Sequence, residues 1–489
     1  MRMKNWKVVL LGLTFAAVLI LSACSESKDA ADVTNNAESS ADITVTEEET
    51  VTENPYVPDL PEEKFEGYTF RVASASENTT FDIWTFDVAE QSGEVVEDSF
   101  YLRNRAIEEQ YGIIISAEVV TNSNVTKAIK AGEDAYDIVF ERAFNTVSMI
   151  LGNLIYDLNT VPYLNLDYPY WDQNSINDLS VQNKAFMASG DIQLSSFDCT
   201  WTLYFDKDMI VDYNLESPYT YIDSNKWTFD TFFDMARTVK SDLNGDGVMD
   251  RTDQWGFSTH QGTYPGLIIA AGEYFSHKDS KDVPELAMST ANFQAVYEKV
   301  LYVMHQDEVT FDPIEREKSF GDNPQVGIFT QNRALFFSEV MNIILTNLRE
   351  KENDYGMIPW PKFSESQDRY HNYVNEAAAM MSIPVTAGNI DRTGILVEAL
   401  AYASTDTVRE AYYEIAIKDK YSRDDRMEEM LDLIFDNRSY DMVFIYNWGG
   451  FRDAFYRLAV SNSPDLASVV STYETKVAAD IEKLITAIN

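Results

Sequence analysis

Residues 227–257 read WTFDTFFDMARTVKSDLNGDGVMDRTDQWGF and contain three successive structural signals. The first part predicts an amphipathic helix, because apolar residues recur at helical spacing at Phe229, Phe232, Phe233 and Ala236. The acidic run that follows contains two glycines and several short polar side chains, so it cannot continue the helix. The aromatic triplet Trp255-Gly256-Phe257 then predicts the start of a strand.

The acidic loop has the spacing of a calcium-binding loop. Its ligand positions one, three, five, seven, nine and twelve are Asp242, Asn244, Asp246, Val248, Asp250 and Asp253, and its sixth residue is Gly247. A hard cation needs several oxygen ligands and a sharp turn to gather them, which favours structural Ca²⁺. The alternative is an acidic surface turn without metal. The second helix of an EF-hand is missing, and Asp253 is shorter than the usual bidentate glutamate, so both interpretations stay open.

The N-terminus has the anatomy of an export signal. Three basic residues precede an apolar run at residues 8–21, and Leu21-Ser22-Ala23-Cys24 follows. The run is too short to cross a bilayer comfortably with such flanks. The last four residues resemble the bacterial lipoprotein box, which implies a signal peptide at residues 1–23 and acyl chains such as palmitate on Cys24. The alternative is an ordinary signal peptide, with Cys199 as the other thiol in either case.

Residues 24–64 are rich in Ser, Ala, Thr, Asn and acids and contain almost no large apolar side chain. Such a segment cannot bury enough surface to offset the entropy of ordering, so we expect a disordered acidic linker. A lipid on Cys24 and this linker predict an extracytoplasmic protein that is anchored to the cell membrane. The formal net charge of −42 excludes nucleic acid as a partner, because a phosphate backbone would be repelled.

The rest of the chain is long enough for two domains. Strands are expected at residues 68–74, 113–120 and 136–140, and helices at 94–111 and 125–131. This alternation predicts a mainly parallel sheet with covered faces, where ligands collect beyond the carboxyl ends of the strands. Residues 195–205 are expected to be extended as the chain crosses into another lobe. Tyr264-Pro265-Gly266 is expected to interrupt the chain before a helix.

The usual catalytic and nucleotide-binding motifs are missing from the sequence. It contains no P-loop, no GxGxxG after a strand, no GxSxG, no HExxH and no paired CxxC. The four histidines are far apart and have no ligand spacing. The sequence therefore predicts a protein that is not an enzyme. A pair of carboxylates for glycoside hydrolysis stays possible in a chain with 80 acids, although no pair stands out.

Several segments together resemble the family 1 extracellular solute-binding proteins of bacterial ABC importers, whose known relatives bind oligosaccharides. In chain order they are AGEDAYDIV at 131–139, WTLYFDK at 201–207, WTFD at 227–230 with WGF at 255–257, RALF at 333–336, YGMIPWP at 355–361 and SIP at 382–384. Each motif alone is weak, but in this order behind a lipoprotein signal they are specific. They are spread over nearly the whole body of the protein.

The resemblance implies an α/β protein with a two-lobed type II periplasmic-binding-protein fold and a ligand cleft between the lobes. By this analogy the first α/β lobe comprises residues 65–195 and 377–437, and the second comprises 196–376 and 438–489. The implied function is a monomeric substrate-binding lipoprotein that captures a sugar or oligosaccharide and delivers it to ABC permease subunits. Residues 141–144 lack the tryptophan that some maltodextrin binders carry there, so the sugar stays undefined.

A sugar presents apolar C–H faces and a rim of hydroxyl groups, so its receptor needs aromatic faces and fixed polar side chains. The stacking candidates, which lie in or beside loops, are Trp201, Tyr264, Trp360 and Trp448. The polar candidates, at predicted strand ends or at the crossing, are Glu141, Arg142, Asp198 and Glu339. The alternative for each is core packing, a solvated surface or an ion pair. Alternatives for the whole protein are a binder of a peptide or polyamine, or a membrane-anchored glycoside hydrolase.

Overall fold

The computed structural model describes residues 56–74, 84–317, 323–348, 351, 353–413 and 426–489. The chain divides into two units, residues 1–54 and 55–489, and the structure described below belongs to the second. The predicted signal peptide, Cys24 and most of the predicted linker lie outside the described residues. Of the linker, residues 56–64 are described, and the ring of Tyr56 meets that of Tyr168 at 6.2 Å between centroids. Within this described part, no helix has the length and apolar character to cross a membrane.

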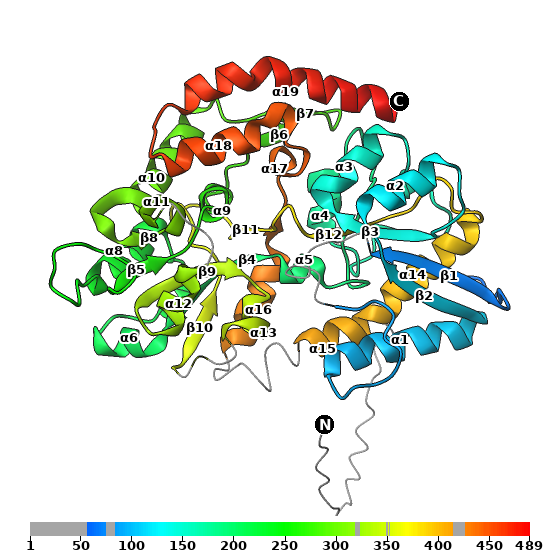
Figure 1. Ribbon diagram of the computed structural model, residues 1–489, viewed down its shortest axis with the longest axis horizontal. Helices are drawn as coiled ribbons and strands as arrows, with labels where there is room; N and C mark the ends of the chain where they lie inside the picture. Colours follow the sequence, from blue (N-terminus) through cyan, green and yellow to red (C-terminus); the bar gives the residue numbers. More distant parts are fainter. Residues whose placement is uncertain (1–55, 75–83, 318–322, 349–350, 352, 414–425) are drawn as a thin grey trace, which may run out of the picture. The chain divides into compact units, whose positions relative to one another are not determined.

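The first sheet has four strands in the order β12-β3-β1-β2. Strand β1 runs parallel to β2 and β3, as predicted, whereas β12 joins β3 antiparallel. The bounds are β1 (Tyr68–Ser74), β2 (Ile113–Val119), β3 (Ile138–Arg142) and β12 (Ala379–Ser382). The helices around this sheet are α1 (Val95–Tyr111), α2 (Asn122–Lys130), α3 (Ala143–Leu151) and α14 (Ile390–Ser404) (Figure 1). Gly112 ends α1 with φ 68°, as the sequence predicts.

The second sheet has five strands in the order β10-β4-β9-β5-β8. It is mixed, since β5 is parallel to β8 and β9 while β4 is antiparallel to β9 and β10. The bounds are β4 (Trp201–Asp206), β5 (Trp255–Ser258), β8 (Thr310–Phe311), β9 (Ala334–Val340) and β10 (Tyr355–Ile358). Two sheets with their own helices make the described part a two-lobed α/β protein, which confirms the predicted fold class.

The helix and strand predicted around the acidic loop build the second lobe. Helix α8 (Phe229–Val239) turns its phenylalanines inward, and the ring of Phe232 meets Phe257 and Phe336 at centroid distances of 5.1 and 4.9 Å. A Cβ atom at Gly256 would lie only 2.1 Å from the carbonyl oxygen of Ala236. Glycine therefore lets β5 approach the backbone of α8 closely, and the apolar face of α8 covers the sheet.

Two local expectations are wrong. Residues 195–205 are not all extended, because α5 (Ser195–Asp198) forms a helical turn before β4 and the amide of Cys199 donates to the carbonyl oxygen of Ser195 at 2.9 Å. Pro265 does not interrupt the chain but is the third residue of α9 (Thr263–Ala270). The amides of a first helical turn have no partner within the helix, so a proline is tolerated there.

The remaining elements complete both lobes and connect them. Between the sheets' strands these are η1 (Leu158–Thr160), α4 (Gln173–Leu179), α6 (Lys207–Asp212), α7 (Pro218–Asp223), β6 (Ser276–Lys278), β7 (Pro284–Leu286), α10 (Ala291–His305), η2 (Gln306–Glu308), α11 (Pro313–Glu317), α12 (Pro324–Thr330), α13 (Ile343–Thr346) and β11 (Asn372–Tyr373). After α14 come η4 (Thr405–Arg409), α15 (Glu410–Tyr413), α16 (Arg426–Asp436), β13 (Arg438–Ser439), α17 (Met442–Tyr446), η6 (Trp448–Gly450), α18 (Phe451–Val460) and α19 (Leu466–Ile488).

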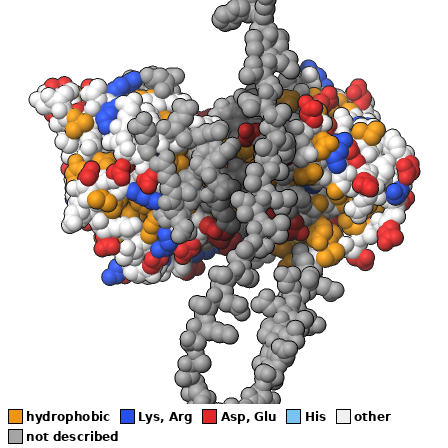
Figure 2. Space-filling view, turned by 90° about the horizontal axis from the view of Figure 1, so that it is seen from below, with side chains coloured by type: hydrophobic (Ala, Val, Ile, Leu, Met, Phe, Trp, Pro, Cys, Tyr) orange, Lys and Arg blue, Asp and Glu red, His pale blue; other side chains and the backbone are white. Residues whose placement is uncertain are grey.

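The C-terminal helices lie against elements of both lobes. Helix α19, drawn in red in Figure 1, contacts α18 and η6 and also packs on α3 of the first lobe. At its end, Lys184 Nζ donates a hydrogen bond to the carbonyl oxygen of Ile488. Acidic side chains are scattered with Lys and Arg over the surface drawn in Figure 2 and do not gather in one patch. The large negative charge is thus a general property of this surface.

Candidate ligand-binding site

Strand β3 of the first lobe ends with Glu141 and Arg142. Glu141 is fully buried, and its carboxylate accepts hydrogen bonds from Asn122 Nδ2 at 2.7 Å, Asn145 Nδ2 at 3.0 Å and the amide of Arg142 at 2.8 Å. Burial raises the pKa of Glu141, and these three donors and the charge of Arg142 oppose the rise. The carboxylate is therefore held by protein donors at the carboxyl end of the strand.

The guanidinium of Arg142 has no comparable set of partners. Its Nε and Nη2 atoms are buried and make no hydrogen bond, and within the described part of the chain it forms no ion pair. Its closest aromatic neighbour is Phe144, with 5.9 Å between Cζ and the ring centroid. Buried charged donors that lack an acceptor are costly, so this position is where an acceptor from outside the chain would be stabilising.

The C-terminal helices bring a second arginine to the same ring. Arg452 of α18 places its Cζ 5.7 Å from the centroid of Phe144 and forms an ion pair of 3.5 Å with Glu376. Glu376 also accepts a hydrogen bond of 2.6 Å from the hydroxyl of Tyr373, on β11. The segment between β11 and β12 therefore joins the end of β3 to the C-terminal helices. Sequence reasoning missed Phe144, Tyr373, Glu376 and Arg452 as site candidates.

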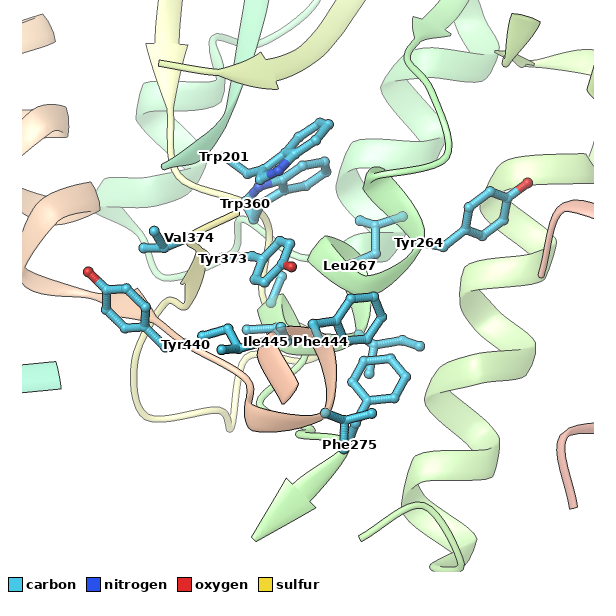
Figure 3. Close-up of a cluster of buried hydrophobic side chains, with 14 of the residues drawn as sticks. Trp201, Tyr264, Leu267, Phe275, Trp360, Tyr373, Val374, Tyr440, Phe444 and Ile445 are labelled. Carbon is cyan, nitrogen blue, oxygen red and sulfur yellow. The ribbon is translucent and has the colours of Figure 1, made fainter. Parts of the chain in front are cut away.

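Trp201 and Trp360 form the aromatic part of the candidate site. They are 1% and 0% exposed, and the Nε1 donor of each is buried without a hydrogen-bond partner. Both indoles border the first turns of α9, because a Cβ at Gly262 would lie 2.3 Å from Trp201 Cζ2 and one at Gly266 would lie 3.6 Å from Trp360 Cζ2. Figure 3 shows the two indoles side by side with Tyr373 below them. Two predicted aromatic candidates are thus brought together.

A charged pair borders this aromatic cluster. Glu339 of β9 lies 3.1 Å from His260, measured from Oε2 to Nε2, and the imidazole centroid is 4.9 Å from the ring of Trp201. Burial by itself lowers the pKa of His260, but the charge of Glu339 and their hydrogen bond outweigh burial and raise it. Glu339 therefore favours the protonated form of the imidazole beside Trp201.

Asp198 lies at the crossing between the lobes. Its carboxylate is fully buried and accepts hydrogen bonds from Trp84 Nε1 at 2.7 Å and from the Tyr412 hydroxyl at 2.9 Å. These donors come from segments 114 and 214 residues away. Asp198 thus ties the crossing helix α5 to two first-lobe segments, and its carboxylate is engaged within the protein.

Two aromatic candidates lie apart from the tryptophan pair. The hydroxyl of Tyr264 pairs with His305 Nε2 at 3.0 Å, and Figure 3 shows its ring directed away from Trp201 and Trp360. Tyr264 lies on α9 rather than in a loop, which explains this direction. Trp448 lies on η6, is 3% exposed and stacks on Tyr446 at 5.0 Å between centroids. Core packing accounts for the positions of both rings.

Two measured cavities lie elsewhere in the described part. One of about 650 Å³ is lined by residues that include Arg251, Arg333 and Lys351, and one of about 500 Å³ is lined by residues that include Asp178 and Tyr440. Neither includes Arg142, Trp201 or Trp360 in its lining.

The acidic loop between α8 and β5 is held by its own backbone amides. Asp242 accepts hydrogen bonds from the amides of Gly245 at 2.7 Å and Gly247 at 2.8 Å. The fully buried Asp253 accepts from the amides of Leu243 and Asp250, both at 2.9 Å. No group of three or more His, Cys, Asp or Glu side chains among the described residues is arranged to hold a metal ion. Calcium at this loop stays a prediction.

The two sheets, the crossing segments and the aromatic and charged side chains between them define a class: a two-lobed protein that binds a small solute. Residues 101–409, more than half of the chain, match the model of the bacterial extracellular solute-binding proteins. The chain belongs to this family, and the resemblance in its sequence motifs is thereby confirmed. Members of this family are binding proteins rather than enzymes.

Solved structures with the same fold are distant in sequence. UspC of Mycobacterium tuberculosis is 11% identical with a TM-score of 0.55 and covers 84% of this chain and 100% of its own. An open sugar transporter of Rhizobium etli is 14% identical with a TM-score of 0.54, covering 86% and 99%. Lmo0181 of Listeria monocytogenes, an ABC substrate-binding protein in complex with cycloalternan, is 9% identical with a TM-score of 0.50, covering 86% and 99%. No curated protein sequence matches the chain.

Proposed function

We propose that this protein is the substrate-binding component of an ABC importer and that it captures a sugar or oligosaccharide between its two lobes. The observation that supports this most is the pair of buried indole donors, Trp201 Nε1 and Trp360 Nε1, which have no acceptor among the described residues. A sugar offers hydroxyl oxygens to such donors and C–H faces to the rings that carry them. The solute-binding family and sugar-binding structural relatives agree with this assignment.

The ligand is held by groups from both lobes, so it stabilises the closed arrangement over the open one. Arg142 comes from the end of β3, and Trp201, Glu339 and Trp360 come from the second lobe. A ligand shifts such an equilibrium only by its difference in affinity for the two arrangements. The closed form then presents one composite surface to permease subunits in the membrane, which accept the sugar.

We further propose that the protein works as a monomer outside the cytoplasm, attached by a lipid on Cys24. The lipoprotein-like sequence at residues 21–24 supports the anchor. Mass spectrometry of the protein purified from membranes should show a diacylated N-terminal cysteine. A mature N-terminus elsewhere, or an unmodified cysteine, would contradict the anchor.

Isothermal titration of the protein with a panel of neutral and acidic oligosaccharides tests the proposed binding. At least one glycan should bind with measurable heat and raise the melting temperature, because a ligand that binds only the folded state stabilises it. The absence of heat and of any thermal shift across the panel would contradict sugar binding. Chromatography of the same mixtures after a day should show the glycans intact, since cleavage would indicate a glycoside hydrolase.

A further inference from the structure

One edge of the Arg142 guanidinium is unpartnered, and it is the edge that recognises carboxylates. The two buried nitrogens without acceptors are Nε and Nη2. Their N–H bonds run parallel along one side of the planar group, at the spacing of the two oxygens of a carboxylate. This edge therefore carries two parallel donors that match a carboxylate, and both are covered by the protein in this structure without an acceptor.

The acids near Arg142 are engaged elsewhere. Glu141 precedes it on β3, where successive side chains point to opposite faces, and its carboxylate already accepts three hydrogen bonds. Glu376 pairs with Arg452 at 3.5 Å, and Glu339 pairs with His260 at 3.1 Å. Among the described residues, no ion pair neutralises Arg142. Arg142 thus interacts electrostatically with Glu141, but no acceptor pairs with its Nε and Nη2 atoms.

We propose that the ligand of this site is an acidic sugar, and specifically an oligosaccharide with a uronate carboxylate that pairs with Nε and Nη2 of Arg142. The inference rests on the proposed sugar-binding function and names the substrate class. A neutral hydroxyl or a water molecule can accept one hydrogen bond here but leaves the second buried donor without an acceptor, which is expensive. A planar carboxylate supplies two acceptors and the opposite charge together. The indoles of Trp201 and Trp360 then contact the sugar rings.

The overall charge of the chain does not exclude an acidic ligand. The formal net charge of −42 repels an anion at long range, but salt at physiological strength screens charges beyond about 8 Å. The basic side chains at the candidate site are Arg142, Arg452 and His260. Two of these have acidic partners, so Arg142 supplies the charge that the ligand neutralises.

The test titrates the full chain with trigalacturonate, trimannuronate and triguluronate, each beside its methyl ester. The ester keeps the sugar skeleton and removes the charge. At least one acid should bind about tenfold or more tighter than its ester, the factor that corresponds to one strong charge-assisted pair. Arg142→Lys keeps a positive charge and loses the bidentate edge. Its affinity for the acid should fall about tenfold, and its affinity for the ester should stay within about twofold of the parent value.

Arg237→Gln is the matched control, because Arg237 is an exposed arginine of α8 with 44% of its side chain accessible. It should leave the affinity for both acid and ester unchanged. Arg142→Gln should fold with an unchanged circular dichroism spectrum and a melting temperature no lower than that of the parent, since it removes two buried donors that have no acceptor. A lower melting temperature would indicate a structural partner for Arg142 and overturn the inference.

The possible outcomes separate this inference from the proposed function. Binding of neutral glycans with no preference for any acid would overturn the uronate assignment and leave sugar binding intact. Equal losses of affinity for the acid and for its ester in Arg142→Lys would show that Arg142 only positions other groups. Tighter binding of sulfated than of carboxylated oligosaccharides would also overturn the carboxylate assignment. Failure of every sugar to bind would contradict the proposed function itself.

Discussion

A comparison of two tryptophans measures whether the unpartnered indole donor of Trp201 is reserved for a ligand. Trp201 and Trp227 are both buried, at 1% and 0% exposure. Trp201 Nε1 has no partner, whereas Trp227 Nε1 donates to the carbonyl oxygen of Pro359 at 3.0 Å. Replacing either with phenylalanine removes the same atoms. The two variants therefore lose similar packing, but only Trp227→Phe also loses a hydrogen bond.

The size of the difference follows from these two environments. In Trp227→Phe the buried carbonyl of Pro359 loses its donor, which costs about 1–3 kcal/mol in addition to the lost packing. In Trp201→Phe no hydrogen bond is lost, and removal of a buried unpaired donor offsets part of the lost packing. We expect Trp227→Phe to be less stable than Trp201→Phe by about 2 kcal/mol.

Guanidinium chloride unfolding followed by far-ultraviolet circular dichroism measures this difference without relying on tryptophan fluorescence. Titration with a glycan that binds the parent protein gives the second half of the comparison. Trp201→Phe should weaken this ligand by about 3- to 10-fold, the value of one neutral hydrogen bond, and Trp227→Phe by less than twofold. Equal loss of stability in the two variants, or unchanged affinity in Trp201→Phe, would refute the reasoning.

Three further predictions concern other parts of the protein. Burial lowers the pKa of His371 from 6.5 to about 4, and the charge of Arg369 adds to the effect, so the neutral form is favoured in the folded state. The contribution of His371 to the free energy of unfolding should be fully present above pH 6.5 and should fall by about 3 kcal/mol as the pH drops to 4. Denaturant titrations should show a smaller fall in the His371→Gln variant. Gly262→Ala should displace the Trp201 indole, because the new Cβ would lie 2.3 Å from its Cζ2. The variant should lose about 1–3 kcal/mol of stability and should bind the glycan more weakly. An unchanged glycan affinity in calorimetry would contradict this position of the indole. If the acidic loop binds calcium, millimolar Ca²⁺ should raise the melting temperature of the parent but not of Asp246→Ala, and an equal response of both proteins would leave an acidic turn without metal.

The sequence predicts those parts of the fold that depend on neighbours along the chain. The apolar spacing of residues 229–236 predicts α8, and the glycine after Tyr111 predicts the end of α1, because both signals are local. The wrong expectation for Pro265 also has a local cause. Proline is excluded from a helix interior but accepted in its first turn, and the sequence does not show where that turn begins.

The candidate site depends on long-range contacts, and the sequence predicts it only in part. Trp201, Trp360 and Glu339 lie around α9 and β9, and their contact with a ligand stays a prediction. Asp198 was expected to contact ligand, but its burial and its bonds to Trp84 and Tyr412 depend on segments far away in the chain. Arg452 was missed because it reaches the site only through the packing of α18. The Gly-rich segment Asn447–Gly450 before α18 was a local signal in its vicinity.

The proposed closure of the lobes would displace helix α19 by a distance that a spectroscopic label can report. It packs on α18 and η6 and also on α3, while its last residue accepts a hydrogen bond from Lys184. Its 23 residues span about 34 Å at 1.5 Å each. A rotation of about 10° around one end would carry the other end through about 6 Å. Paired labels on α3 and near residue 466, at the end of α19 away from Lys184, should therefore register ligand-driven closure as a change in distance.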